Sequence, residues 1–358
     1  MADSVMTRPM ERMHEWAYEH AVILKGIEEV WHKTGNIKYF NFIKETMDTF
    51  VAEDGTIKYY NKDNFNIDNI NNGKILMTLY KQTKEDKYKK AIDTLYAQLL
   101  EHPRTSEGVF WHKKIYPYQI WLDGLYMGAP FYASYLKEFG HQEDIEDVIK
   151  QFILSYKYLR DEKTGLLQHA YDETREQFWC DKETGLSHSF WGRSIGWYVM
   201  ALVDVLDYVE EDHPERKTLI NMLQASMDAL IKVQDKETGV WYQVLDKGNE
   251  KGNYLEASAS CMFVYAMAKG IRKGYLGAQW LIDVKKAYNG LIEEFIMVTN
   301  QGLVNLNKNC MVAGLGGDDK RDGSYAYYIS EPIVANDGKG VGAFIMASIE
   351  IEKMCIRS

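Results

Sequence analysis

Residues 116–136, YPYQIWLDGLYMGAPFYASYL, contain a single charged side chain, Asp123. From Gly124 to Leu136, thirteen residues in succession are uncharged. That length is too short for a membrane span, which needs about 20 apolar residues, and it suits a helix buried in a protein core. An acid beside such a helix loses hydration, so the presence of Asp123 requires its own explanation.

Four further apolar runs recur along the chain. They are NINNGKILMTLY (69–80), RSIGWYVMALVDVL (193–206), EASASCMFVYAMAKGI (256–271) and GVGAFIMASIEI (340–351). Amphipathic segments lie between them, namely KYKKAIDTLYAQLL (87–100), IEDVIKQFILSYKYL (145–159), TLINMLQASMDALIKV (218–233) and VKKAYNGLIEEFI (284–296). Helices that are apolar on all sides need cover everywhere, whereas one-sided helices face water. The sequence therefore predicts a buried inner ring of helices inside an amphipathic outer ring.

A recurring turn supports a repeated architecture. Its closest copies are DEKTGLL (161–167), DKETGLS (181–187) and DKETGVW (235–241). At about 60 residues per helical hairpin, the chain accommodates roughly six hairpins. We therefore expect an all-α fold that closes into a double toroid of six helical hairpins. The alternative is an open helical solenoid, which would leave the apolar helices uncovered.

Composition predicts one large globular domain over residues 1–358. Of these residues 46% are hydrophobic and 26% charged, and the six prolines are scattered without a Ser/Gly/Pro-rich linker. The net charge of −10 argues against a nucleic-acid partner. Nothing in the sequence points to an obligate protein partner.

Targeting and redox signals predict a cytoplasmic protein. The first residues lack the apolar segment of a secretory signal, and no run is long enough to cross a membrane. The four cysteines, at 180, 261, 310 and 355, show neither metal-ligand spacing nor the density of a disulfide framework, so we expect reduced thiols.

Chemically capable residues gather where loops enter the apolar runs. In a ring of helices these junctions meet at one end of the barrel axis and line a concave surface. The candidates are Asp68, His112, Lys113, Trp121, Asp123, His169, Trp191, Arg193 and Trp197. Structural interpretations also exist: an Asp before a helix is often an N-cap, and a lone His is often a hydrogen-bonded junction residue. Trp191 and Trp197 lie six residues apart and do not share one helical face well, so one is explained as core and the other as a wall of the site.

The combination of junction residues favours acid chemistry. Two carboxylates, Asp68 and Asp123, resemble the paired acids of carbohydrate hydrolysis, in which one is protonated and the other ionised. Trp121 beside Asp123 reduces its hydration and favours the protonated form. Arg193 is expected to offer a planar fork to a substrate carboxylate, and Lys113 adds a point charge.

A glycine-rich segment, GLGGDDKRDGS (314–324), is interpreted as part of a mobile loop from Val312 that closes over a ligand, with Ala313 and Gly314 as binding residues. The histidines and cysteines show no metal-ligand motif, and there is no phosphate-binding loop, dinucleotide fingerprint or nucleophile elbow. We therefore expect neither a metal nor an organic cofactor.

Seven motifs together resemble glycoside hydrolase family 105, the unsaturated rhamnogalacturonyl hydrolases, over residues 16–349. The motifs are WAYEH, NIDNINNGK, RTSEGVFWHKKIYPYQIWLDGLYMGAPF, FWGRSIGWYVMAL, DKETGVWYQV, LEASASCMFVYAMAKGI and ISEPIVANDGKGVGAF. The resemblance implies an (α/α)6 barrel and metal-free removal of a 4,5-unsaturated galacturonyl residue from rhamnose in pectin fragments.

By motif position, the resemblance implies roles for individual residues. Asp123 matches the proton donor and Asp68 its partner acid. The positions that match substrate contacts are Tyr18, His112, Lys113, His169, Trp191, Arg193 and Trp197. The implied chemistry is hydration of the C4=C5 vinyl ether, so the carboxylate-separation rule for retaining and inverting enzymes does not apply.

Three alternatives stay open on the sequence. A hydrolase similar to family 88 would act on unsaturated glucuronyl residues of glycosaminoglycan fragments. A sugar epimerase on a similar barrel would normally use paired histidines, whereas acids dominate these junctions. A non-catalytic helical scaffold would not concentrate Trp, His and Arg at loop–helix junctions.

Overall fold

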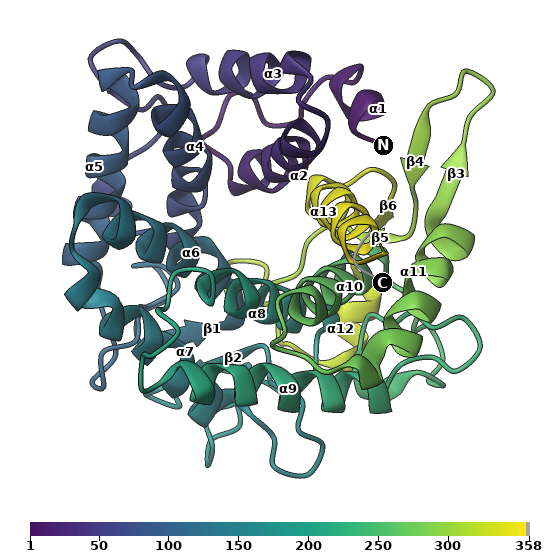
Figure 1. Ribbon diagram of the computed structural model, residues 1–358. Helices are drawn as coiled ribbons and strands as arrows, with labels where there is room; N and C mark the ends of the chain where they lie inside the picture. Colours follow the sequence, from purple (N-terminus) through teal and green to yellow (C-terminus); the bar gives the residue numbers. More distant parts are fainter. Residues whose placement is uncertain (356–358) are drawn as a thin grey trace.

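A closed ring of helices forms the centre of the computed structural model, which describes residues 1–355 (Figure 1). In this range the inner ring consists of α2 (Tyr18–Thr34), α4 (Gly73–Thr83), α6 (Leu122–Phe139), α8 (Gly192–Val205), α10 (Ala257–Arg272) and α13 (Gly338–Cys355). Each inner helix contacts the next, and α13 contacts α2. The closed (α/α)6 barrel is thus confirmed, and the open solenoid is excluded. The predicted single domain includes residues 356–358, which lie outside the described range.

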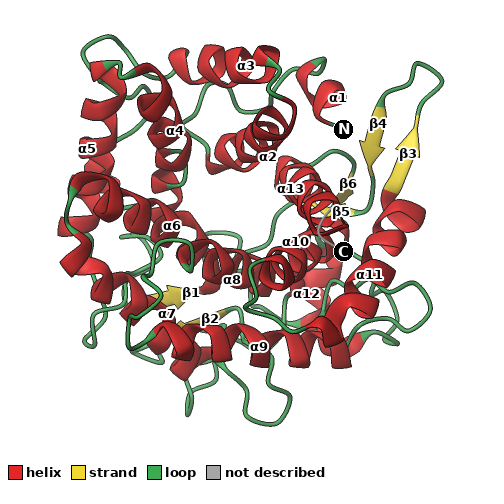
Figure 2. Cartoon of the chain, in the orientation of Figure 1, coloured by secondary structure: helices red, strands yellow, loops and turns green. Residues whose placement is uncertain are grey.

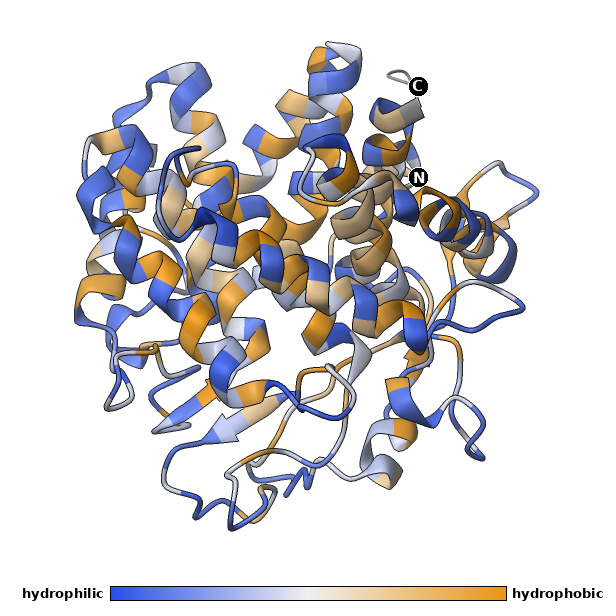
Figure 3. Cartoon of the chain, turned by 60° about the horizontal axis from the view of Figure 1, so that its bottom comes forward, coloured by the Kyte–Doolittle hydropathy of each residue, from blue (hydrophilic) through white to orange (hydrophobic). Residues whose placement is uncertain are grey.

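Amphipathic helices cover this ring. They are α3 (Ile37–Asp48), α5 (Asp86–Glu101), α7 (Ile145–Leu159), α9 (Arg216–Lys232) and α11 (Leu281–Phe295), while the short α1 (Ala2–Met6) packs against α2. Figure 3 shows apolar and polar residues mixed along the outer helices, as expected for helices with one buried face. The four amphipathic segments predicted from the sequence correspond to α5, α7, α9 and α11.

Short elements connect the helices (Figure 2). Three two-stranded antiparallel sheets pair β1 (Gln119–Trp121) with β2 (Ala170–Asp172), β3 (Ile296–Val298) with β4 (Val304–Leu306), and β5 (Asn309–Cys310) with β6 (Ile333–Val334). The 3-10 helices are η1 (Lys62–Asn64), η2 (Ile67–Ile70), η3 (Gln142–Asp144), η4 (Leu245–Lys247) and η5 (Ala278–Trp280), and α12 spans Tyr325–Ser330.

The three near-identical sequence turns share one structure. In the first, Asp161 accepts hydrogen bonds from the backbone and hydroxyl of Thr164, both at 2.7 Å. Gly165 follows with φ +77°, a conformation that glycine adopts without strain. The copies at 181–185 and 235–239 repeat these bonds and the positive φ of their glycines. The repeat is therefore a local Asp–Thr–Gly turn.

Helix α2 is the inner helix that the apolar runs did not reveal. Helix α2 contains several charged residues. Those in its C-terminal half line a polar pocket of about 320 Å³, at the opposite end of the barrel axis from the site described below. The helix approaches α13 closely: a Cβ atom at Gly342 would lie 2.2 Å from the carbonyl oxygen of Val22. The absence of a side chain at Gly342 allows α2 and α13 to pack closely where the ring closes.

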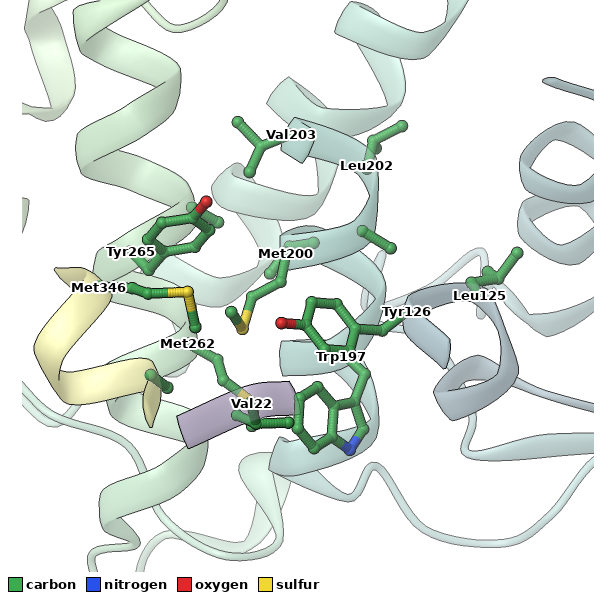
Figure 4. Packing of buried hydrophobic residues seen from close by; sticks show 14 of the residues in the cluster. Val22, Leu125, Tyr126, Trp197, Met200, Leu202, Val203, Met262, Tyr265 and Met346 are labelled. Carbon is green, nitrogen blue, oxygen red and sulfur yellow. The ribbon is translucent and has the colours of Figure 1, made fainter. Parts of the chain in front are cut away.

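Large apolar side chains fill the interior of the ring. Figure 4 shows Trp197 and Tyr126 side by side, with Val22, Met262 and Met346 nearby from other inner helices. The Tyr126 and Trp197 rings stack with centroids 4.7 Å apart. These side chains belong to one apolar cluster inside the ring.

Two expectations from the sequence concern membrane-spanning helices and the state of the cysteines. Within residues 1–355 no helix is both long and apolar enough to cross a membrane. Cys180, Cys261 and Cys310 are buried free thiols, whereas the side chain of Cys355 lies outside the described residues.

Candidate active site

A pocket of about 400 Å³ opens where the chain enters α2, α4 and α6. Most of the residues predicted for the site line it: Tyr18, Asp68, His112, Lys113, Trp121, Asp123, Ala313 and Gly314. Because these are the N-terminal ends of the inner helices, the helix dipoles favour negative charge at this end of the barrel. The expected concave surface is present, and it suits an anionic ligand.

Asp68 lies in η2 and is ion-paired with Lys113. The N-cap of η2 is Asn66, whose side chain accepts from the Asp68 backbone, so Asp68 is not the cap. Its Oδ2 is 2.7 Å from Lys113 Nζ, and its Oδ1 is 3.7 Å from His112 Nε2. Burial alone would raise the pKa of Asp68, but the positive charge of Lys113 and its hydrogen bond to the carboxylate outweigh this effect, so the pKa of Asp68 lies below the ordinary value. Asp68 is therefore ionised at neutral pH.

Asp123 lies in the first turn of α6, opposite His169. Trp121 is the N-cap residue and makes no side-chain cap bond. Strand pairing of β1 with β2 sets Trp121 against Ala170, and Leu122 N donates to the His169 carbonyl at 3.1 Å. As a result His169 Nε2 lies 3.1 Å from Asp123 Oδ2, although the contact lacks the alignment of a full hydrogen bond.

Tyr328 on α12 orients His169 from the other side. Its hydroxyl is 2.7 Å from His169 Nδ1, and both residues are fully buried. Burial raises the pKa of Tyr328 well above its ordinary value, so the phenol keeps its proton and can donate it to Nδ1. In that arrangement a neutral imidazole carries its proton on Nε2, facing Asp123.

Parallel aromatic rings form one wall of the pocket. Trp121 stacks on His112 with centroids 4.5 Å apart and on Tyr116 at 5.1 Å, with interplanar angles of 6° and 10°. Desolvation lowers the pKa of His112 to about 4, so its imidazole is neutral at pH 7. Flat stacked rings of this kind suit the apolar face of a sugar.

The two remaining tryptophans lie behind the pocket. Trp191 packs against His169 at 4.7 Å and donates its indole N–H to Gln243 at 3.2 Å. Trp197 packs against Tyr18, with centroids 6.3 Å apart. Both are 1% exposed and neither lines the pocket. Trp197 supports the lining residue Tyr18, whereas Trp191 supports His169, which contacts Asp123.

Arg193 is not positioned to present a fork to a ligand in this pocket, contrary to the sequence-based expectation. It is 1% exposed, and its Nε donates to Ser258 Oγ at 2.7 Å. Its terminal nitrogens donate to the carbonyls of Cys310 and Met311, and Nη2 lies 3.6 Å from Glu256. Arg193 thus joins α8 to α10 and to the chain that leads into the 312–324 loop.

Several residues of the site escaped the sequence interpretation. Tyr328 and Arg321 come from the segment 312–328, and Arg12 and Glu19 come from the N-terminal side of the pocket. The paired tyrosines of SYAYYISEP (324–332) offered a signal for Tyr328. No local pattern marks Arg321, because its role depends on how its loop folds back.

One cluster among residues 1–355 has the spacing of metal ligands. It consists of His141, Glu143 and Asp144, all exposed, and none of them lines the pocket. Exposed acidic groups of this kind are common in proteins without bound metal, so the cluster gives no reason to place an ion in the site.

Comparison with known proteins identifies the group to which this architecture belongs. The model of the family described as Glycosyl Hydrolase Family 88 matches residues 1–355. The chain belongs to this glycoside hydrolase family. A solved structure of a family 105 glycoside hydrolase from C. acetobutylicum ATCC 824 is 56% identical, with a TM-score of 0.97 and 98% of each chain covered. These matches confirm the resemblance to family 105 and decide against an epimerase or a non-catalytic scaffold.

Two of three further similar proteins carry names of specific activities. The unsaturated rhamnogalacturonyl hydrolase YesR of Bacillus subtilis (strain 168) is 28% identical over 271 residues, covering 74% of each chain. Protein Atu3128 of Agrobacterium fabrum is 38% identical over 232 residues, covering 63% of this chain and 97% of its own. The unsaturated glucuronyl hydrolase from Bacillus sp. GL1 shares 14% identity with a TM-score of 0.70, which shows a common fold.

Proposed function

We propose that this glycoside hydrolase releases 4,5-unsaturated galacturonic acid from rhamnose in rhamnogalacturonan fragments. The observation that carries the proposal is the pair of differently held carboxylates in one pocket. Asp68 is ion-paired with Lys113 and ionised, whereas Asp123 lies 3.1 Å from His169 and beside Trp121, with no lysine or arginine partner among residues 1–355. Acid catalysis requires such a division between a group that holds a proton and one that holds a charge.

The proposed reaction is hydration of a vinyl ether. Asp123 gives its proton to C4 of the double bond, and positive charge develops at C5 and the ring oxygen. Ionised Asp68 stabilises this charge across the pocket. Water then adds to C5 and gives a proton back to Asp123, which restores the acid. The C5 hemiketal opens, and the hemiacetal left at C1 releases the rhamnose.

The identity of the sugar follows from similarity and not from the pocket alone. YesR, named as an unsaturated rhamnogalacturonyl hydrolase, supports a galacturonyl substrate. The second candidate, an unsaturated glucuronyl hydrolase, shares the barrel and the chemistry. The cytoplasmic location expected from the sequence stays a prediction, with the buried free thiols in its favour.

Ultraviolet absorbance tests this proposal directly, because hydration removes the conjugated double bond. We expect the protein to bleach the unsaturated galacturonyl–rhamnose disaccharide with a kcat/KM at least about tenfold above that for unsaturated glucuronyl disaccharides of glycosaminoglycans. Bleaching of the glucuronyl substrates alone would favour the second candidate. No bleaching of either substrate would contradict the hydration chemistry.

A further inference from the structure

Arg321 places its guanidinium in the wall of the pocket. Gly316 and Arg321 pair as an antiparallel bridge, so the intervening residues make a tight turn. The side chain folds back over this turn: Nε donates to the Gly316 carbonyl at 3.0 Å, and Nη2 donates to Tyr116 Oη at 3.1 Å. These two bonds fix the plane of the guanidinium beside the Tyr116–Trp121 stack.

Two glycines make room for this group. A Cβ atom at Gly314 would lie 2.6 Å from Arg321 Nη1, and one at Gly317 would lie 3.0 Å from Nη2. A side chain at Gly314 would therefore push the guanidinium away, and one at Gly317 would crowd it. Gly317 also has φ +74°, which its place in the turn requires. The glycine-rich sequence of the loop thus serves to seat an arginine.

The other cations of the site are already neutralised by protein carboxylates. Lys113 is paired with Asp68, and Arg12 contacts Glu15 at 2.5 Å and Glu19 at 2.7 Å. Arg193 is buried beside Glu256. Among residues 1–355, by contrast, no carboxylate lies within 4 Å of the Arg321 guanidinium. Its charge is available to an anion that enters the pocket.

The donor count agrees with an anionic ligand. A guanidinium has five N–H groups in one plane, and two of those of Arg321 are engaged by Gly316 and Tyr116. Both N–H groups of Nη1 and one of Nη2 are left. A carboxylate accepts two parallel N–H bonds from such a fork.

The geometry points to Arg321 as the residue that binds the carboxylate of the unsaturated uronyl ring, and so as the residue that selects uronates over neutral sugars. This assignment rests on the proposed function and deepens it. The ring itself lies against the Tyr116–Trp121 stack, from which the Arg321 fork reaches the C5 carboxylate. The role foreseen for Arg193 in carboxylate binding thereby passes to a residue of the 312–324 loop.

Comparison of an acid with its ester tests the assignment. The substrates are the unsaturated galacturonyl–rhamnose disaccharide and its methyl ester, which keeps the double bond but loses the charge. We expect the wild type to prefer the acid in kcat/KM by about 10- to 100-fold, the range for a charged hydrogen bond. Arg321→Gln should raise KM for the acid by a similar factor, leave KM for the ester nearly unchanged, and so abolish the preference. Arg321→Lys should recover part of it.

Lys320→Gln is the matched control, because it removes a positive charge from the same turn at a residue that does not line the pocket. It should keep the preference for the acid. If Arg321→Gln lost activity equally on acid and ester, its role would be structural and the assignment would be overturned. Calorimetric titration with galacturonate and with its methyl ester separates this inference from the proposed function: loss of galacturonate binding in Arg321→Gln supports the inference even without turnover, and unchanged binding contradicts it.

Discussion

His169 Nε2 lies 3.1 Å from Asp123 Oδ2, and neither atom has a fully formed hydrogen bond to any described residue. The contact is poorly aligned in the free protein, as catalytic hydrogen bonds often are before substrate binds. Tyr328 holds the imidazole of His169 through its hydrogen bond to Nδ1. Oδ2 of Asp123 has no aligned hydrogen bond, so the carboxyl group is free to turn toward a ligand. In the proposed mechanism Asp123 transfers the proton, and His169 and Tyr328 position its carboxyl group.

Replacement of Asp123 tests the transfer itself. Asp123→Asn keeps the size of the side chain but removes the acidic proton, so kcat should fall by about 10²- to 10⁴-fold, the usual contribution of a general acid. Bleaching of the disaccharide measures kcat, and calorimetry should show that the variant still binds substrate. Near-normal turnover with intact folding would assign the proton to another group.

Tyr328 is expected to act as a positioning residue. In Tyr328→Phe the ring packing stays, but His169 Nδ1 loses its partner at 2.7 Å. The imidazole can then carry its proton on either nitrogen, so we expect kcat to fall about tenfold while KM changes little. Tyr327→Phe is the control, since the Tyr327 hydroxyl accepts from Gly314 N and does not contact His169. Equal losses in the two variants would point to loop stability instead of imidazole orientation.

The Asp68–Lys113 pair makes stability depend on pH. Asp68 has a lowered pKa in the folded protein, so its ionisation stabilises the fold above the ordinary Asp pKa, and this contribution is lost as pH falls through the lower folded value. Lys113→Met removes the main cause of the lowering. The free energy of unfolding should therefore drop by about 1.5–3 kcal/mol at pH 7, and the difference from wild type should shrink toward pH 3.

Lys114→Met provides the control for that measurement, because Lys114 is exposed and donates weakly to the Asp63 carbonyl at 3.4 Å. It should change stability by less than about 0.5 kcal/mol at either pH. A loss in Lys113→Met that stayed constant from pH 7 to pH 3 would show that the lysine stem, and not its charge on Asp68, stabilises the fold.

Helix-level features were predictable from the sequence because they depend on local patterns. Apolar runs identified five inner helices, and Asp68 and Asp123 followed from their places at helix entrances. Helix α2 was missed because its charged residues face a polar pocket and its closest packing depends on Gly342 of α13. Contacts between side chains that are distant in the sequence could not be predicted. Tyr328 lies 159 residues from His169 along the chain, and only the closed ring brings the two together.

The contrast between Arg193 and Arg321 gives the last prediction. Arg193→Met leaves Glu256, which is 0% exposed, without its guanidinium neighbour at 3.6 Å. Breaking a buried pair in this way should lower the free energy of unfolding by about 3–5 kcal/mol, measured by chemical denaturation. The double variant Arg193→Met/Glu256→Gln should recover part of the loss, because no buried charge is left unpaired. Folded Arg193→Met protein should still have a higher kcat/KM for the unsaturated disaccharide than for its methyl ester. If Arg193→Met were as stable as wild type and had lost that preference, Arg193 would be the carboxylate fork and Arg321 would not.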